Sequence, residues 1–420
     1  MNRATSDWKV RFFTIWIGQT LSLIGTSLGS FALIWWLTTT TGSAAVLAAA
    51  SLAAFLPRIL LSPIAGVLVD RWNRKWVIVS SDGFIALVSL GLAWLSWTGS
   101  LQAWHLYAAA VCRSIGSAFH GPAMNASTSL LVPEKHLSRV SGLNMTLSGT
   151  LGLAGPMLGA LAITLLPLHS VMMIDVVTAA FAIGPVLYFA IPQPKHSARV
   201  RRESLWGNLV EAARYLRTAP GLLALMLAFT IGNFLVSPVG SYMPLFVTQY
   251  FKGGAFHLAT LESGWGIGYI VGGLLFTLWA GFKRKTTTIF VATMFQGIGF
   301  LIVGFAPATG ILVAAAGLIF AGIMNTYSNG PGAPLLQANV PPELQGRVMT
   351  LSDTVSQAMY PLGLLIAAPL VTRFGVRPLI LFGGGYLLLN GFFAFIPIIR
   401  NLESALAKQK EAQKAEEAAD

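Results

Sequence analysis

Long apolar runs, each close to the 20 or so residues that cross a bilayer as a helix, recur along almost the whole chain. Hydrophobic residues make up 55% of the sequence and charged residues only 10%, a balance that is unusual for a soluble domain. Because lipid offers no hydrogen-bond partner to the backbone, such runs fold as helices. The sequence therefore predicts an all-α polytopic membrane protein with twelve transmembrane helices. The predicted spans cover about residues 11–37, 44–68, 76–97, 104–126, 140–165, 169–191, 221–249, 258–281, 286–306, 309–332, 347–372 and 377–399.

Lys and Arg are concentrated in alternate loops, while the loops between these, such as 38–43 and 98–103, contain neither. The positive-inside rule then predicts that both termini are cytoplasmic, in a multi-pass protein of the cytoplasmic membrane. The net charge of +12 follows from this topology, so no nucleic-acid partner is needed to explain it. The first apolar run is too long for the core of a signal peptide, and we expect it to remain as the first helix. The basic loops contain Arg3, Lys9 and Arg11; Arg71, Arg74 and Lys75; Lys135 and Arg139; and Lys283, Arg284 and Lys285.

A weak internal repeat with a spacing of about 208 residues divides the chain into two halves. His120-Gly121-Pro122-Ala123 is followed by a Val-Pro-Glu segment and an Arg-Val pair, and Asn329-Gly330-Pro331-Gly332 is followed by similar residues. Pro and Gly are common at helix ends, so coincidence remains the alternative. The repeat predicts two pseudo-symmetric six-helix bundles at 1–191 and 221–400, joined by a cytoplasmic linker at 192–220 and followed by a cytoplasmic tail at 401–420.

The linker between the two predicted bundles is polar and basic. If Ser204 caps a helix there, five apolar residues fall on one face of it. That pattern is typical of an amphipathic helix on the membrane surface, and a solvated linker is an equally good interpretation. The five residues are Leu205, Leu209, Ala212, Ala213 and Leu216.

The loop after the second predicted span combines a glycine, one acid and several bases. Gly66 would let two helices approach closely, and Asp70 could pair with a helix N-terminus or with an Arg of the other half. Together with Arg71, Arg74 and Lys75 these residues predict a cytoplasmic gate. The segment resembles the Gly-x-x-x-Asp-Arg-x-x-Arg-Lys signature of the major facilitator superfamily. The matching loop of the second half, residues 281–285, has bases but no acid.

The four acids that fall within predicted spans and Arg113, near the middle of the fourth span, are the candidates for proton coupling: Asp82, Arg113, Asp175, Glu262 and Asp353. A charge inside the membrane costs at least ~2.5–3.5 kcal/mol on insertion scales, so such residues usually have a function or a partner. Arg113 resembles the fourth-helix Arg of proton-coupled members of the superfamily, which implies a part in coupling. The alternative for Arg113 is that it packs against a carboxylate for stability alone. For Asp82 and Asp353 the alternative is pairing at a helix end, and for Glu262 it is a position at the lipid headgroups.

Two further sets of residues are predicted to shape the transport path. Gly155, Pro156 and Gly159 would bend the fifth span and bring a neighbour close, and they resemble the fifth-helix signature of exporters in the superfamily. Polar residues within spans would line a central cavity or join helices by hydrogen bonds. These cavity candidates are Gln19, Asn144, Asn233, Gln296, Asn325 and Gln357.

Several stretches that run in order along the chain resemble the macrolide-efflux branch of the superfamily, among them 16–19, 55–57, 113–123, 131–134, 174–176 and 346–348. This resemblance implies the twelve-helix fold and export of drugs in exchange for protons. The expected partners are a bulky amphiphilic small molecule, protons and membrane lipids, with the protein as a monomer. No motif for a metal, a nucleotide or another cofactor occurs, so an enzyme is not expected. Export of an endogenous metabolite, siderophore or lipid remains an alternative, as does a non-transporting receptor or scaffold.

Overall fold

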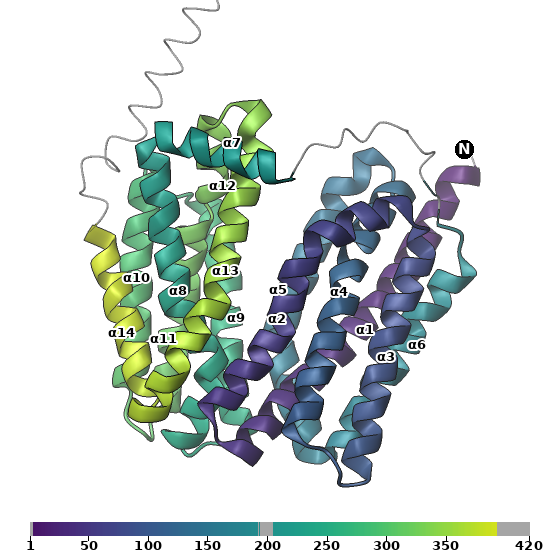
Figure 1. Cartoon of the computed structure of the whole chain (residues 1–420), viewed down its shortest axis with the longest axis horizontal. Helices are drawn as coiled ribbons and strands as arrows, with labels where there is room; N and C mark the ends of the chain where they lie inside the picture. Colours follow the sequence, from purple (N-terminus) through teal and green to yellow (C-terminus); the bar gives the residue numbers. More distant parts are fainter. Residues whose placement is uncertain (1–2, 192, 194–204, 393–420) are drawn as a thin grey trace, which may run out of the picture. The chain divides into compact units, whose positions relative to one another are not determined.

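The computed structural model describes residues 3–191, 193 and 205–392, and every element in these ranges is a helix (Figure 1). Among the described residues, ten helical segments are long and apolar enough to cross a membrane. The prediction of an all-helical fold is therefore confirmed for the described residues, and these ten segments fit the predicted membrane spans in length and composition. The ten segments omit α4 (Ala103–Leu131) and the shorter apolar helix α14 (Val376–Asn390), so the count of twelve spans stays a prediction. The predicted tail at 401–420 lies outside the described residues.

Packing divides the chain into two compact units, called here the N-terminal unit and the C-terminal unit. The N-terminal unit comprises Met1–Val200 with Ser241–Ser263, and the C-terminal unit comprises Arg201–Gly240 with Gly264–Asp420. The predicted bundle boundaries stay a prediction. The N-terminal unit contains α1 (Arg3–Thr41), α2 (Ala44–Arg71), α3 (Arg74–Trp97), α4 (Ala103–Leu131), α5 (Glu134–Leu165), α6 (Leu168–Tyr188) and parts of α8 (Pro220–Gln249) and α9 (Ala255–Leu278).

Glycines allow α1 to lie close against α6 in the N-terminal unit. A Cβ atom added at Gly18 would lie 2.4 Å from the carbonyl oxygen of Phe181, which is far inside van der Waals contact. Small residues at helix interfaces permit this close approach in membranes, where dispersion contacts and hydrogen bonds replace the hydrophobic effect as the force that joins helices. α3 packs against both α4 and α6, so α1, α3, α4 and α6 enclose a common interior (Figure 1).

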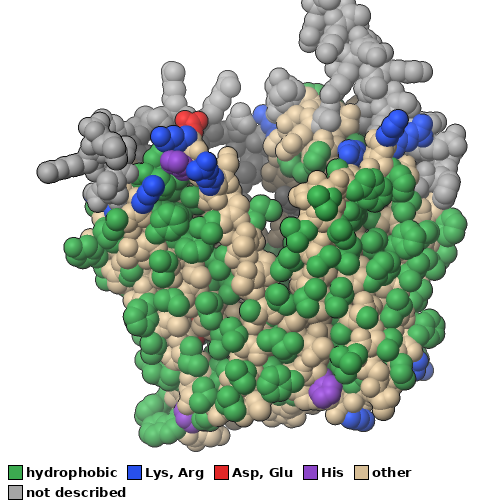
Figure 2. All heavy atoms as spheres, turned by 180° about the vertical axis from the view of Figure 1, so that it is seen from behind, with side chains coloured by type: hydrophobic (Ala, Val, Ile, Leu, Met, Phe, Trp, Pro, Cys, Tyr) green, Lys and Arg blue, Asp and Glu red, His purple; other side chains and the backbone are tan. Residues whose placement is uncertain are grey.

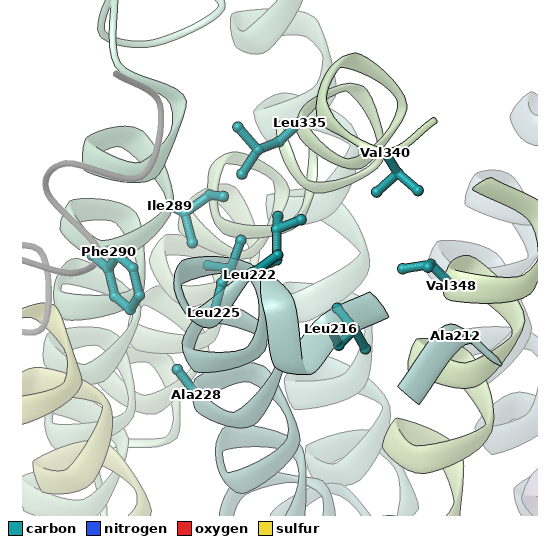
Figure 3. Close-up of a cluster of buried hydrophobic side chains, with 11 residues drawn as sticks. Ala212, Leu216, Leu222, Leu225, Ala228, Ile289, Phe290, Leu335, Val340 and Val348 are labelled. Atoms are coloured by element: carbon teal, nitrogen blue, oxygen red, sulfur yellow. The ribbon is translucent and has the colours of Figure 1, made fainter. Parts of the chain in front are cut away.

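The C-terminal unit contains a buried apolar cluster that joins α7 (Leu205–Thr218) to longer helices of the unit, among them α13 (Pro342–Phe374) (Figure 3). Ala212 and Leu216 of α7 are buried there with Leu222 of α8 and Val348 of α13. α7 lies across the helices of its unit instead of along them (Figure 1), and the Arg347 guanidinium donates to the Glu211 carboxylate. The remaining helices of the unit are α7 (Leu205–Thr218), α10 (Lys285–Phe305), α11 (Ile311–Asn329), α12 (Gly332–Asn339), α13 (Pro342–Phe374) and α14 (Val376–Asn390).

The two copies of the internal repeat differ in backbone structure. α4 continues through Pro122 without interruption, whereas the second copy is divided at Gly330 and Pro331 into α11 and α12. A proline removes one backbone donor and crowds the preceding turn, so both outcomes are accessible to the same local sequence. The fourth helix of the first half is therefore one continuous helix that supports side chains along its length.

Apolar side chains cover the outside of each unit. On the face that Figure 2 shows, hydrophobic side chains (green) occupy the middle of each unit, and Lys and Arg side chains (blue) lie toward the ends. Leu87, Trp94 and Phe181 are among the exposed large apolar residues. An exposed apolar band flanked by charge is what a bilayer requires of a spanning protein.

Candidate functional site

The interior of the N-terminal unit contains a buried ion pair between α4 and α6. Nη1 of Arg113 donates to Oδ2 of Asp175 at 2.7 Å and to the Ser89 hydroxyl at 2.6 Å. The Ser89 hydroxyl donates to the same Oδ2 at 2.7 Å, and the Thr26 hydroxyl donates to Oδ1 at 2.9 Å. We call these four residues the Arg113 layer. Both oxygens of Asp175 thus receive hydrogen bonds, and the residue is only 1% exposed.

One nitrogen of this layer is not satisfied. Nη2 of Arg113 is buried and has no hydrogen-bond partner among the described residues. A buried donor without a partner loses hydration without compensation, at a cost of roughly 1–3 kcal/mol or more for a charged group. The guanidinium therefore has unused capacity to bind an acceptor.

A second buried cluster lies between α1, α3 and α4. Nε2 of His120 is 3.1 Å from Oδ1 of Asp82 and 3.1 Å from Oε1 of Gln19. Nε2 of Gln19 donates to Oδ2 of Asp82 at 2.9 Å. We call these three residues the His120 layer. Gln19 and Asp82 are both buried, at 6% exposure.

The two layers are related by a constant spacing along three helices. Each of these helices carries one residue of each layer, and the two are seven positions apart: Gln19 and Thr26 of α1, Asp82 and Ser89 of α3, and Arg113 and His120 of α4. Seven residues make almost two full turns and rise about 10.5 Å, so both members of a pair face the same way. The three helices therefore present two polar layers to one interior, and α6 adds Asp175 to one of them.

The remaining two coupling candidates lie elsewhere. Glu262 is half-buried on α9, beside Ser263, whose hydroxyl donates to the carbonyl of Leu153 in the N-terminal unit at 2.7 Å. Asp353 belongs to α13, and its side chain lies outside the described part of the structure. Of the five candidates, Asp82, Arg113 and Asp175 are the three whose side chains the structure places in the two layers.

The predicted gate residues divide into buried and exposed members. Arg74 is buried, donates from Nη1 to the carbonyl of Ala126 at 3.1 Å, and lies 3.5 Å from Asp70, whose side chain is 65% exposed. Nζ of Lys75 donates to the carbonyls of Leu187 and Phe189 at the C-terminal end of α6, where a cation is favoured by the helix dipole. The loop is therefore tied to α4 and α6 of its own unit.

Gly66 and Arg71 have no comparable structural role within the described residues. A Cβ added at Gly66 would meet no described heavy atom within 4 Å. The close helix approach predicted at this glycine is thus not found in the N-terminal unit. Arg71, the last residue of α2, is exposed.

The fifth-helix motif does allow a close approach, and its neighbour is α1. A Cβ at Gly155 would lie 2.2 Å from the Ser27 hydroxyl oxygen, and one at Gly159 would lie 2.7 Å from the Phe31 Cβ. Pro156 lies within α5, which continues past it to Leu165. α5 therefore packs on the helix that supplies Gln19 and Thr26 to the two layers.

The six cavity candidates have different environments. Asn144 accepts a hydrogen bond from Trp16 at 2.8 Å and so joins α5 to α1. Gln296 is buried, Asn325 is half-buried and Gln357 is exposed. Gln19 belongs to the His120 layer. Asn233 lines a cavity of about 260 Å³ within the C-terminal unit, with Phe229, Met349, Ser352 and Ser356 among the other lining residues.

Sequence reasoning missed three residues of the layers, namely Thr26, Ser89 and His120. Ser and Thr within a membrane helix usually bond to their own backbone, so nothing marked these two. A neutral His is not counted as a charge, and His120 therefore drew attention only as part of the repeat. The signal that would have found all three is the seven-residue spacing from Gln19, Asp82 and Arg113.

Buried charges inside an apolar helical bundle are typical of membrane transporters, and comparison with known proteins gives the family. Residues 15–364 match the Major Facilitator Superfamily model. The chain belongs to that superfamily.

Known relatives agree with this assignment. Macrolide efflux protein A of Streptococcus pyogenes is 32% identical over 379 residues, which cover 90% of this chain and 94% of that protein. Multidrug efflux pump Tap of Mycobacterium bovis is 23% identical over 411 residues, covering 94% and 95%. The resemblance to macrolide-efflux proteins in the sequence is therefore confirmed.

A solved transporter structure shares the fold. A bacterial homologue of the human lysosomal transporter Spinster has a TM-score of 0.72 at 14% identity, covering 94% of this chain and 98% of that one. At such low identity the likeness concerns the fold alone.

Proposed function

We propose that this protein is a proton-coupled secondary active exporter of bulky amphiphilic compounds, with macrolide-type antibiotics as the first substrates to test, and that it works by alternating access. The observation that carries the proposal is the buried pair of Arg113 and Asp175 in a chain similar to macrolide efflux proteins. Energy for export would come from protons that enter as the drug leaves.

The chemistry of the pair supports a proton-dependent conformational change. With Asp175 ionised, the pair is neutral and its acceptors and donors are largely matched. A proton on Asp175 leaves the Arg113 charge without a counter-ion, which is costly in a buried site. Protonation would therefore favour whichever conformation hydrates Arg113 or gives it another acceptor. Coupling of alternating access to proton entry needs this kind of dependence of the conformation on the bound proton.

The proposal includes the topology and the partners. Twelve helices in two six-helix bundles would span the cytoplasmic membrane, with both termini in the cytoplasm and residues 66–75 at a cytoplasmic gate. The partners would be the drug, protons and surrounding lipids, and the unit of function would be a monomer without a cofactor. A membrane potential would add ~2.3 kcal/mol per elementary charge per 100 mV to export.

The test measures accumulation of a labelled macrolide in cells that express the protein. Wild type should lower accumulation, and a protonophore should abolish the effect. Asp175→Asn should lose most of the efflux, while Glu134→Gln, at an exposed acid at the start of α5, should retain it. Detergent gel filtration of each variant controls for folding.

Three outcomes would contradict parts of the proposal. Efflux that resists the protonophore would exclude proton coupling. Unchanged accumulation and susceptibility across a broad drug panel, together with altered metabolites in a deletion strain, would favour an endogenous substrate. A phenotype that survives Asp175→Asn and Arg113→Ala would favour a receptor or scaffold.

A further inference from the structure

The His120 layer is not used by the mechanism above, yet it is built around two titratable side chains. Asp82 has 7% of its side chain exposed and His120 has 20%. The carboxylate is thus enclosed, and the imidazole is the member of the pair that remains accessible. A neutral His120 beside an ionised Asp82 leaves the layer with one net negative charge, which one proton would neutralise.

Gln19 determines which ring nitrogen can receive that proton. Its amide nitrogen donates to Asp82, so its amide oxygen is the atom that faces Nε2 of His120. Two acceptors, this oxygen and Oδ1 of Asp82, therefore lie 3.1 Å from the same ring nitrogen. Nε2 must carry a hydrogen to satisfy them. The free position is Nδ1, for which no hydrogen bond to a described residue is found.

We propose that Asp82, His120 and Gln19 form a second proton-binding site, in which a proton added at Nδ1 of His120 gives an imidazolium paired with the Asp82 carboxylate. Binding of the proton depends only on the cluster itself. Any part that this proton plays in transport rests on the proposed function. No bond other than N–H forms, and the proton comes from hydronium of the solvent, which is left as water.

The charged surroundings of this site are simple. On the same three helices, the nearest ionisable neighbour toward the other layer is Arg113, paired with Asp175 of α6, two turns away. α5 has no ionisable residue after Arg139 within its bounds. Cys112 of α4, beside Arg113, is half-buried. The other groups on the packed helices lie near helix ends or on exposed faces: Lys9 and Arg11 of α1, Arg58, Asp70 and Arg71 of α2, Arg74 and Lys75 of α3, His105 and Tyr107 of α4, and His169 and Tyr188 of α6.

The spacing of the layers separates them into two sites. A rise of about 10.5 Å between them is too long for a direct hydrogen bond between Asp82 and Asp175, since hydrogen bonds join atoms about 3 Å apart. The two layers are therefore distinct clusters with no direct hydrogen bond between their carboxylates.

The closing experiment measures proton uptake by purified protein in lipid nanodiscs, without any drug, between pH 8 and pH 5. The curve of wild type minus His120→Gln gives the proton bound by His120. The same subtraction in an Asp82→Asn background gives the proton that His120 binds when the Asp82 carboxylate is absent. We expect one proton in the first curve, and we expect the second curve to differ from it, because only the first protein retains the carboxylate that pairs with the imidazolium.

The matched control is His105, whose Nδ1 accepts from the Gln102 backbone and which has no carboxylate partner among the described residues. Its difference curve should be the same in both backgrounds. A His120 curve that contains no proton, or that Asp82→Asn does not move, would overturn the proposal. If Asp82→Asn does not fold, Asp82→Ser replaces it. Because no drug is present, failure here is distinct from failure to export macrolides.

Discussion

Gly25 of α1 lies directly against Asp175 of α6. A Cβ added at position 25 would come within 3.1 Å of the Asp175 Cα and 2.1 Å of the Thr178 hydroxyl oxygen. The carboxylate that pairs with Arg113 is therefore held by a backbone position that has no room for a side chain. The closeness of α1 and α6 is part of the site.

Gly25→Ala should displace α6 and weaken the Arg113 layer. Overpacking typically costs about 1–3 kcal/mol, so we expect a lower thermal midpoint in detergent and reduced efflux. Gly184→Ala is the matched control, because a Cβ there meets no described atom within 4 Å. Equal midpoints for the two variants would show that α6 does not need this contact.

Ser27 and Gly155 should behave as a coupled pair. Gly155→Ala places a Cβ 2.2 Å from the Ser27 hydroxyl oxygen but 3.4 Å from the Ser27 Cβ, so Ser27→Ala should relieve the clash. A double-mutant cycle on thermal unfolding should give a favourable coupling of about 0.5–3 kcal/mol. Gly152→Ala, on the same helix with an open environment, should be additive with Ser27→Ala. Additivity in both cycles would contradict the α1 and α5 packing described above.

Thr26→Val should test the hydrogen bonding of Asp175 with little change of shape. The substitution removes the donor to Oδ1, and a lost hydrogen bond to a buried charged group costs roughly 1–3 kcal/mol. We expect lower thermal stability and several-fold weaker efflux. Thr39→Val, at an exposed Thr that bonds only to its own helix backbone, controls for the loss of a hydroxyl. Wild-type efflux and stability in Thr26→Val would show that Oδ1 needs no donor.

Arg74 and Arg71 belong to one loop and one motif but should differ in their effect on stability. Arg74→Ala removes a buried guanidinium that bonds to the Ala126 carbonyl, and we expect a loss of about 1–3 kcal/mol. Arg71→Ala changes an exposed side chain and should leave the thermal midpoint within experimental error. The ranking is checked by parallel melting of the two purified variants, and a reversed ranking would contradict the burial of Arg74.

The sequence predicted the helical fold and three buried ionisable residues for one reason, the high cost of polar groups in lipid. That cost marks Asp82, Arg113 and Asp175 within apolar runs, whatever their neighbours are. It does not say which helices meet, because lipid-facing and protein-facing side chains are equally apolar. The pairing of α1 with α6, and with it the contact of Gly25 with Asp175, could not be predicted for that reason.

The same limit explains the other differences. Gly66 and Gly155 look alike as small residues in motifs, but only Gly155 has a close neighbour within its own unit. His120 was not recognised because its role depends on Gln19 and Asp82, which are 101 and 38 positions away along the chain. Depth along a helix can be read from the sequence, whereas the partner across the interior cannot.

The seven-residue spacing shared by three helices also restricts how these helices can change in length. One residue inserted between Gln19 and Thr26, or between Asp82 and Ser89, would turn everything beyond it by about 100°. The polar group of one layer would then face lipid while the other layer stayed in place. Homologues that keep both layers should therefore tolerate many substitutions within these segments but no insertions or deletions, so an alignment gap there would signal a transporter that has lost one of its two layers.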